Sequence, residues 1–184
     1  MGLISNGTTI FDAGALDSGL AKGAMTFIKK LTASSSATLS FVDGASSVVL
    51  DNTYKEYLFT FNNIHPATDN TQFAFQVDTG TNTSYNIACT SSTFRAYHNE
   101  AGNDAGLGYV TGEDQAQGTS FQKLTAGGTV GNDADQSASG YLHIFNPSSS
   151  VFVKHFICRS NAYHASDYTA DFYAAGYFNT TTAL

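Results

Sequence analysis

Tryptophan is absent from this sequence, proline and cysteine occur twice each, and charged residues make up only 12% of the chain. Cys89 and Cys158 have no CxxC spacing, and each lies in a run of alternating apolar residues. We therefore interpret both as small buried hydrophobic residues. No apolar stretch approaches the roughly 20 residues that span a bilayer, so we expect no membrane insertion. We expect no signal peptide either, because residues 1–6 have no basic region and no apolar core follows them.

Basic residues are also scarce, since 8 Lys and Arg stand against 15 Asp and Glu, for a formal net charge of −7. A phosphate backbone needs a clustered basic face, so this balance argues against nucleic acid as a partner. The one adjacent basic pair, Lys29-Lys30, fits a solvated strand edge better than a phosphate contact.

The sequence is rich in Phe (14), Tyr (10) and Gly (17). Its most regular stretch is 54–78, YKEYLFTFNNIHPATDNTQFAFQVD, in which two runs at 57–61 and 73–77 alternate apolar with mostly polar residues. Successive strand side chains point to opposite sides, so each run predicts a strand with one apolar face. The linker at 62–70 holds a proline, an aspartate and three asparagines, which predicts the turn of a hairpin.

Short strands separated by turn-forming residues are expected along the rest of the chain, at 24–32, 38–42, 47–50, 85–90, 94–98, 107–110, 121–124, 140–146, 151–159 and 172–178. Those at 140–146 and 172–178 are apolar on both faces, which predicts buried central strands. Residues 125–139 have no periodicity and are expected to form an exposed loop. About a dozen short strands without a helical period predict an all-β fold, an antiparallel β-sandwich of jelly-roll type.

Residues 1–22 are small and polar, with Gly at positions 2, 7, 14 and 19. We interpret them as an extended N-terminal arm with a short strand near 8–11. An arm with so few core residues packs on a neighbour or flexes. The predicted organisation is therefore an attachment arm at 1–22 and one β-sandwich domain at 23–184.

Patterns typical of enzymes and metal sites are missing from the sequence. The five His residues have no HxH or HxxxH spacing. The oxygen-rich stretches at 99–104, 113–114 and 132–135 do not match a calcium loop, and there is no G-x-S-x-G motif or phosphate-binding glycine loop. We expect no enzyme, no cofactor and no metal. A carboxylate pair for glycoside cleavage stays open as an alternative, although the sequence selects no pair.

Two expected loops carry aromatic residues beside Asn and Asp. Saccharide sites use aromatic faces with nearby amide and carboxylate groups. The candidate residues for contact with a glycan or a partner protein are Tyr97, His98, Tyr163, His164 and Tyr168. The alternative is that these side chains are anchors that pack against the end of the sandwich.

Six segments spread over most of the chain resemble a family of small virion proteins from marine bacteriophages, notably those of cyanobacteria: MGLISNGTTIFDAGALDSG, IKKLTASSSATLSFVDG, EYLFTFNNIHPATDN, GEDQAQGT, NPSSSVFVKHF and GYFNTTTA. The resemblance implies a non-enzymatic structural component, which would be a tail fibre, another appendage or a capsid-surface decoration protein. The family has no catalytic residues to carry over.

This resemblance implies assembly in the host cytoplasm and a final place in the virion. The expected partners are other virion proteins, bound through residues 1–22, and further copies of the chain, with a homotrimer favoured. A carbohydrate-binding module that recognises host surface polysaccharide is the alternative function. Relatives continue past NTTTA into further strands, so we expect either that the sequence extends beyond Leu184 or that another subunit closes the sheet.

Overall fold

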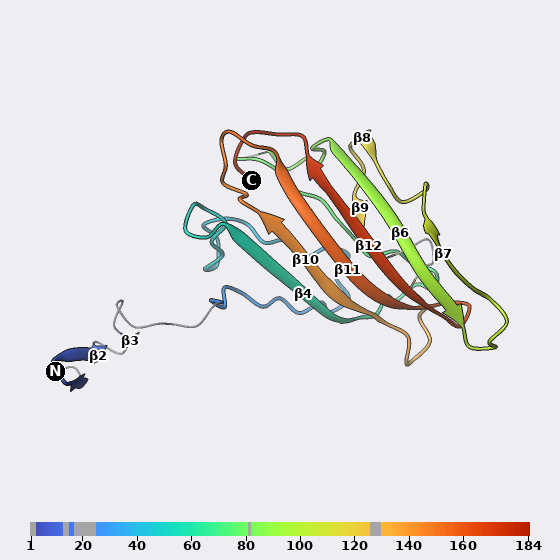
Figure 1. Cartoon of the computed structure of the whole chain (residues 1–184), viewed down its shortest axis with the longest axis horizontal. Helices are drawn as coiled ribbons and strands as arrows, with labels where there is room; N and C mark the ends of the chain where they lie inside the picture. The colour runs from blue at the N-terminus through green and yellow to red at the C-terminus, as the bar shows by residue number, and fades with distance from the viewer. Residues whose placement is uncertain (1–2, 13–14, 17–24, 81, 126–129) are drawn as a thin grey trace.

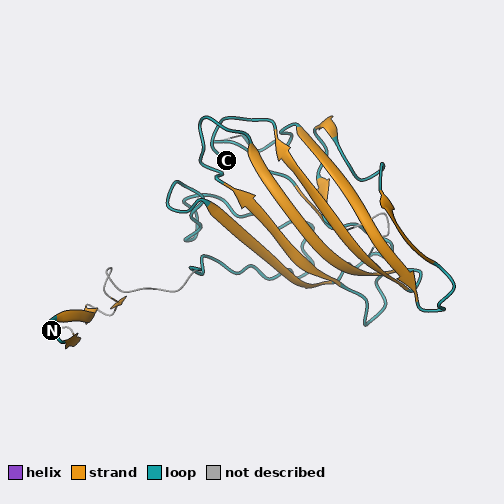
Figure 2. Ribbon diagram, viewed as in Figure 1, coloured by secondary structure: helices purple, strands orange, loops and turns teal. Residues whose placement is uncertain are grey.

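The computed structural model describes residues 3–12, 15–16, 25–80, 82–125 and 130–184, and the regular elements in these ranges are all β-strands (Figures 1 and 2). The strands are β1 (Leu3–Ser5), β2 (Thr8–Asp12), β3 (Ala15–Leu16), β4 (Glu56–Ile64), β5 (Ala74–Phe75), β6 (Cys89–Asn99), β7 (Ala105–Tyr109), β8 (Ala116–Gly118), β9 (Gln122–Lys123), β10 (Ala138–Phe145), β11 (Lys154–His164) and β12 (Tyr168–Phe178). No helix able to cross a membrane occurs in the described ranges. The strand pairs are antiparallel, so the predicted all-β, antiparallel class is confirmed.

A seven-stranded sheet dominates the molecule, in the order β4-β10-β11-β12-β6-β7, with β8 also pairing with β6. Its centre is regular, because β11 pairs with β12 without a break from Lys154↔Phe178 to His164↔Tyr168. The pairing of β12 with β6 is equally unbroken. Side chains in register therefore share a face across these strands, and the apolar alternation of each strand adds to one common surface.

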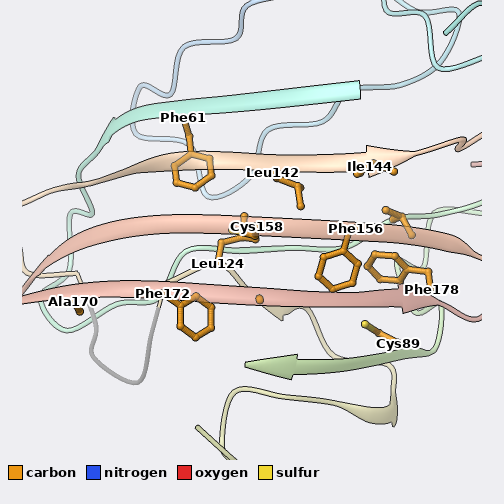
Figure 3. Packing of buried hydrophobic residues seen from close by; sticks show 12 residues of the cluster. Phe61, Cys89, Leu124, Leu142, Ile144, Phe156, Cys158, Ala170, Phe172 and Phe178 are labelled. Atoms are coloured by element: carbon orange, nitrogen blue, oxygen red, sulfur yellow. The ribbon is translucent and has the colours of Figure 1, made fainter. Parts of the chain in front are cut away.

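The hydrophobic core lies on one face of this sheet. Phe156, Phe172 and Phe178 are almost fully buried there, together with Cys89 and Leu124 from the chain around them (Figure 3). Burying a side chain of this size is worth roughly 1.5–3 kcal/mol relative to leaving it exposed. This one cluster therefore supplies much of the stabilisation of the domain.

The second layer consists of the short pair β5 and β9 and of irregular chain. Phe75 on β5 packs edge-on against Phe156 and Phe178, at ring-centroid distances of 5.2 and 5.4 Å. The architecture is thus a sandwich with one large sheet and one small one. This strand order supports the sandwich class and not the jelly-roll topology in particular.

The hairpin predicted at 54–78 is wrong. Its first run forms β4, but β4 pairs with β10, and the second run contributes β5, which pairs with β9. The two runs face each other across the core, where Phe61 and Phe73 meet edge-to-face at 5.0 Å. Hairpin loops usually have two to five residues, so the longer linker at 62–70 is suited to crossing from one layer to the other.

The strands predicted at 24–32, 38–42 and 47–50 do not form, because residues 25–55 are irregular. Only parts of this segment reach the core. Val48 is buried, and the Phe41 ring packs on Phe59 at 5.3 Å. The alternation in these runs is short and interrupted by Lys29 and by turn residues, so no run has enough apolar length to compete for a place in the sheet.

Three further boundaries differ from the expectation. The strand predicted at 85–90 forms only from Cys89, and its last two residues are continuous with the strand predicted at 94–98 in β6. The predicted exposed loop at 125–139 contains buried residues, among them Val130 and Gln136. The segment 163–171, expected to be a loop, is mostly strand, since β11 runs to His164 and β12 starts at Tyr168. In each case pairing with a neighbouring strand overrides the local turn signal.

The N-terminal strands β1, β2 and β3 form a separate small antiparallel sheet that stands apart from the sandwich in Figure 1. The strand expected near 8–11 is confirmed as β2. Leu3, Ile4 and Phe11 on this sheet are exposed. The predicted boundary after residue 22 lies outside the described residues.

Candidate functional site

The face of the large sheet opposite the core is open, and none of the described segments crosses it in Figure 1. The register places Tyr141, Arg159, Tyr173, Phe94 and Tyr109 side by side in one row across five strands. Tyr141 is 39% exposed, Phe94 45% and Tyr109 56%. The prediction that 140–146 and 172–178 are buried on both faces is therefore wrong for this face.

A charged pair is held rigidly in the middle of that row. Arg159 donates from Nε and Nη2 to the two carboxylate oxygens of Asp171, at 3.2 and 2.9 Å. The Tyr173 hydroxyl donates to the same carboxylate, and the guanidinium lies 5.0 Å from the Tyr173 ring centroid. Tyr173 in turn stacks on Phe94 at 4.5 Å. Asp171 raises the pKa of Arg159, so the pair stays charged in a fixed geometry.

Two hollows lie next to each other on the open face. The first has a volume of about 300 Å³ and is lined by His98, Asn99, Glu100, Asn161, Ala162, Tyr163, Tyr168 and Thr169. The second has a volume of about 370 Å³ and is lined by Ser139, Gly140, Tyr141, Arg159, Ser160, Asn161 and Asp171. Asn161 belongs to both, so the hollows are adjacent along β11. Their lining combines tyrosine rings with amide, hydroxyl and charged groups.

The tyrosines of the first hollow are fixed by hydrogen bonds to carboxylates. Tyr163 donates its hydroxyl to Glu100 at 2.9 Å, which raises the pKa of Tyr163 to about 12. Tyr168 donates to Asp104 at 2.8 Å, and this bond also raises its pKa. Both phenols are therefore neutral at ordinary pH, and each ring is tethered at its polar end.

The structure brings all five predicted contact residues to one end of the sheet, but onto both of its faces. His98 and Tyr163 point to the open face, whereas Tyr97, His164 and Tyr168 occupy the alternate positions that face the core. His98, Tyr163 and Tyr168 line the first hollow directly. Tyr97 and His164 do not line it, but each ring lies 5.7 Å from the Tyr168 ring. All five sit on the ends of β6, β11 and β12 rather than in loops, which corrects the predicted location.

Tyr97 and His164 have contacts typical of packing. The Tyr97 ring covers Gly106 of β7 so closely that a Cβ there would lie 2.8 Å from Tyr97 Cε1. His164 accepts a hydrogen bond at Nδ1 from the Ser166 amide, and burial, followed by the charge of Arg95, lowers its pKa. His164 therefore favours the neutral imidazole. The anchor alternative from the sequence describes these two residues better than it describes Tyr163.

Sequence reasoning missed Tyr141, Arg159, Asn161 and Asp171. The signal that could have found them is the alternation itself, because these residues occupy the outward positions of strands whose inward positions fill the core. Strands that are apolar on both faces suggested a second covering layer instead. Only the strand order reveals that no such layer exists among the described residues.

The chemistry available at the site is recognition by stacking and hydrogen bonding. Among the described residues no three His, Cys, Asp or Glu side chains lie close enough together to hold a metal ion. The two cysteines are buried in the core, and burial raises the pKa of each to about 12, so neither is a thiolate at neutral pH. The hollows instead offer fixed rings, a fixed ion pair and side-chain amide groups that are held in place by hydrogen bonds.

Comparison with known proteins finds no match for this chain among protein-family models, curated proteins or solved structures.

Proposed function

We propose that this protein is a non-enzymatic structural component of a bacteriophage virion, attached through its N-terminal arm and presenting the sandwich outward. The observation that carries the proposal is the small sheet β1–β3, which stands apart from the sandwich (Figure 1). Leu3 and Ile4 on it are 62% and 61% exposed. An isolated two-stranded hairpin is marginally stable in water, and the third strand here has only 2 residues. Burial of these side chains against a partner would therefore stabilise the arm.

The resemblance of six sequence segments to marine phage virion proteins supports the same proposal. It favours a tail fibre, another appendage or a capsid decoration protein, with other virion proteins as the docking partners of the arm. A homotrimer fits the rotational symmetry of such positions.

The arm is tested by deleting residues 1–22 and measuring incorporation of the protein into particles. We expect incorporation to be lost while the urea unfolding transition of the sandwich stays in place. A double variant, Leu3→Ser with Ile4→Ser, should also reduce incorporation. Leu107→Ser is the matched control, because it removes an exposed apolar side chain on the sandwich instead. Normal incorporation of the truncated protein would refute the attachment role.

Saccharide recognition is a second candidate function, favoured by the hollow that His98 and Tyr163 line on the open face, with Tyr168 also in its lining. Its test is binding of the protein to an array of host lipopolysaccharides and purified oligosaccharides, with Tyr163→Ala and Tyr168→Ala as variants. Both variants should weaken binding. Tyr54→Ala, a ring outside both hollows, should not. Absence of binding by the parent protein would count against this candidate.

A further inference from the structure

We infer that the two hollows act as one trough, which binds a neutral oligosaccharide of at least two sugar rings across Asn161. This inference rests on the saccharide-recognition candidate and extends it to a second subsite built from Tyr141, Arg159 and Asp171. Nothing in the sequence pattern had placed these residues in a site.

The length of the trough follows from strand geometry. Arg159, Asn161 and Tyr163 are alternate residues of β11, so their side chains point to the same face. A strand rises about 3.3 Å per residue, so roughly 13 Å separates Arg159 from Tyr163 along the strand. Tyr141 pairs with Arg159 at one end, and Thr169 pairs with Tyr163 at the other. The trough is therefore longer than one sugar ring and has a tyrosine at each end.

The polar groups between the two tyrosines still have hydrogen-bonding capacity. A guanidinium has five N–H donors, and Arg159 uses two of them on Asp171. The Asp171 carboxylate has about four acceptor sites, of which Arg159 and Tyr173 fill three. Asn161 donates its amide group to Thr169 Oγ1 and to the Ala170 carbonyl, which fixes the side chain. Spare donors on Arg159 and a spare acceptor site on Asp171 therefore remain for the hydroxyl groups of a sugar, which both donate and accept.

The charge of the trough favours a neutral ligand. Arg159 and Asp171 neutralise each other, and the first hollow contains the Glu100 carboxylate, which accepts the Tyr163 hydroxyl and has no basic partner in the lining. The chain as a whole carries a formal charge of −7. An anionic saccharide would meet repulsion from Glu100 and from this background, whereas a neutral one would not.

The same features argue against an apolar protein partner in the trough. The cores of protein interfaces are depleted in Asp and Ser, whereas the second hollow holds the Asp171 carboxylate and the hydroxyl groups of Ser139 and Ser160. Rings at the ends with polar groups between them fit a chain of sugar rings, whose faces are apolar and whose edges carry hydroxyl groups.

The test is calorimetric titration of the full chain with neutral monosaccharides (glucose, galactose, mannose and N-acetylglucosamine) and with their linear oligomers. An oligomer should bind at least about tenfold more tightly than its own monosaccharide, because it reaches both subsites. Tyr141→Ala in the second hollow should weaken oligomer binding about tenfold, which corresponds to the usual worth of one aromatic contact. Its effect on monosaccharide binding should be smaller, because a single sugar ring can still occupy the first hollow.

Tyr109→Ala is the matched control, because this exposed tyrosine shares the row of Tyr141 but lies outside both hollows. It should bind every sugar as the parent does, and unchanged urea unfolding of each variant shows that the fold is retained. Oligomers that bind no better than monosaccharides, with Tyr141→Ala without effect, would refute the trough and leave single-hollow recognition standing. Tighter binding of sulfated oligomers would refute the neutral class. Failure of every sugar to bind would overturn both the trough and saccharide recognition.

Discussion

Both faces of the large sheet carry aromatic residues, but the fold buries one face and leaves the other exposed. On β12, Phe172 and Phe178 are 0% exposed, whereas Tyr173 and Tyr177, on the opposite face of the same strand, are partly exposed. The covered face uses mainly Phe, and the open face uses mainly Tyr, whose hydroxyl needs a polar partner. The comparison teaches that a strand apolar on both faces can have one buried face and one face available for recognition.

The largest difference in the free energy of unfolding is expected between two variants that each lose one aromatic ring, one on the core face and one on the open face. Phe172→Ala should lower the free energy of unfolding by about 3–5 kcal/mol, because it leaves a cavity in the core. Tyr173→Ala should cost about 1 kcal/mol, because it removes a surface stack on Phe94 and a cation–π contact with Arg159. Urea unfolding followed by circular dichroism measures both. Equal losses would mean that the open face is covered in solution.

A second contrast uses glycines. A Cβ on Gly176 would lie 2.3 Å from the backbone oxygen of Thr90 on β6, whereas nothing lies within 4 Å of a Cβ on Gly108 of β7. Gly176→Ala should therefore destabilise the protein by about 1–3 kcal/mol, as overpacking does. Gly108→Ala should change stability by less than about 0.5 kcal/mol. A tolerated Gly176→Ala would show that β12 and β6 are less closely paired than the register implies.

The two buried thiols on the core face should make the stability of the folded protein depend on pH in the alkaline range. Burial raises the pKa of Cys89 and Cys158 from 9.0 to about 12 in the folded protein. Their contribution to stability is complete below pH 9 and is lost as the pH rises towards 12, because the unfolded thiols ionise first. Between pH 9 and 12, each buried thiol should lower the free energy of unfolding by about 1.4 kcal/mol per pH unit.

The measurement is urea unfolding from pH 9 upward for the parent chain and for a variant with Cys89→Ala and Cys158→Ala. The double variant serves as the control, because it keeps every other titrating group. It should lose less stability with rising pH than the parent. Parallel pH profiles would contradict burial of the thiols.

The smallest effect is expected from the ion pair on the open face. Asp171→Asn removes the carboxylate that forms the ion pair with Arg159, but both side chains of this pair are partly exposed. Exposed pairs contribute about 0–1 kcal/mol, so the unfolding free energy should fall by less than about 1 kcal/mol. The same substitution should weaken oligosaccharide binding, which separates a recognition role from a stabilising one. A loss as large as that of Phe172→Ala would show that the pair supports the fold instead.

Local alternation predicted the long strands of the sheet well. The runs at 57–61 and 172–178 lie within β4 and β12, the run at 140–146 lies within β10 except for its last residue, and the buried state of both cysteines is confirmed. These runs succeed because they combine aromatic or β-branched residues with a strict period of two.

Pairing between strands could not be predicted from the same pattern. The run at 73–77 looks like the natural partner of 57–61, yet the partner of β4 is β10, about 80 residues further along the chain. The shorter runs between residues 25 and 50 also alternate and form no strand, because a strand also needs an edge to join. Which edge is free depends on the whole sheet.

Only the residues of the candidate site that stand out locally could be predicted, because the others depend on how the strands pair. Tyr163 and Tyr168 stood out as aromatic residues beside Asp and Asn, and the structure places both at one hollow. Arg159 and Asp171 are twelve residues apart in sequence and meet only because β11 and β12 pair in a particular register. Their role depends on strand register, which a single sequence does not specify.

The turn before β11 has a consequence for how this molecule meets its surroundings. Lys154 is fully buried, and its ammonium group donates hydrogen bonds to the carbonyl oxygens of Ser149 and Phe152. These bonds hold the two sides of the turn together. At its tip, Val151 and Phe152 are 68% and 66% exposed. The turn is already ordered before contact, so a partner surface that covers this apolar tip would bind it with little further loss of conformational entropy.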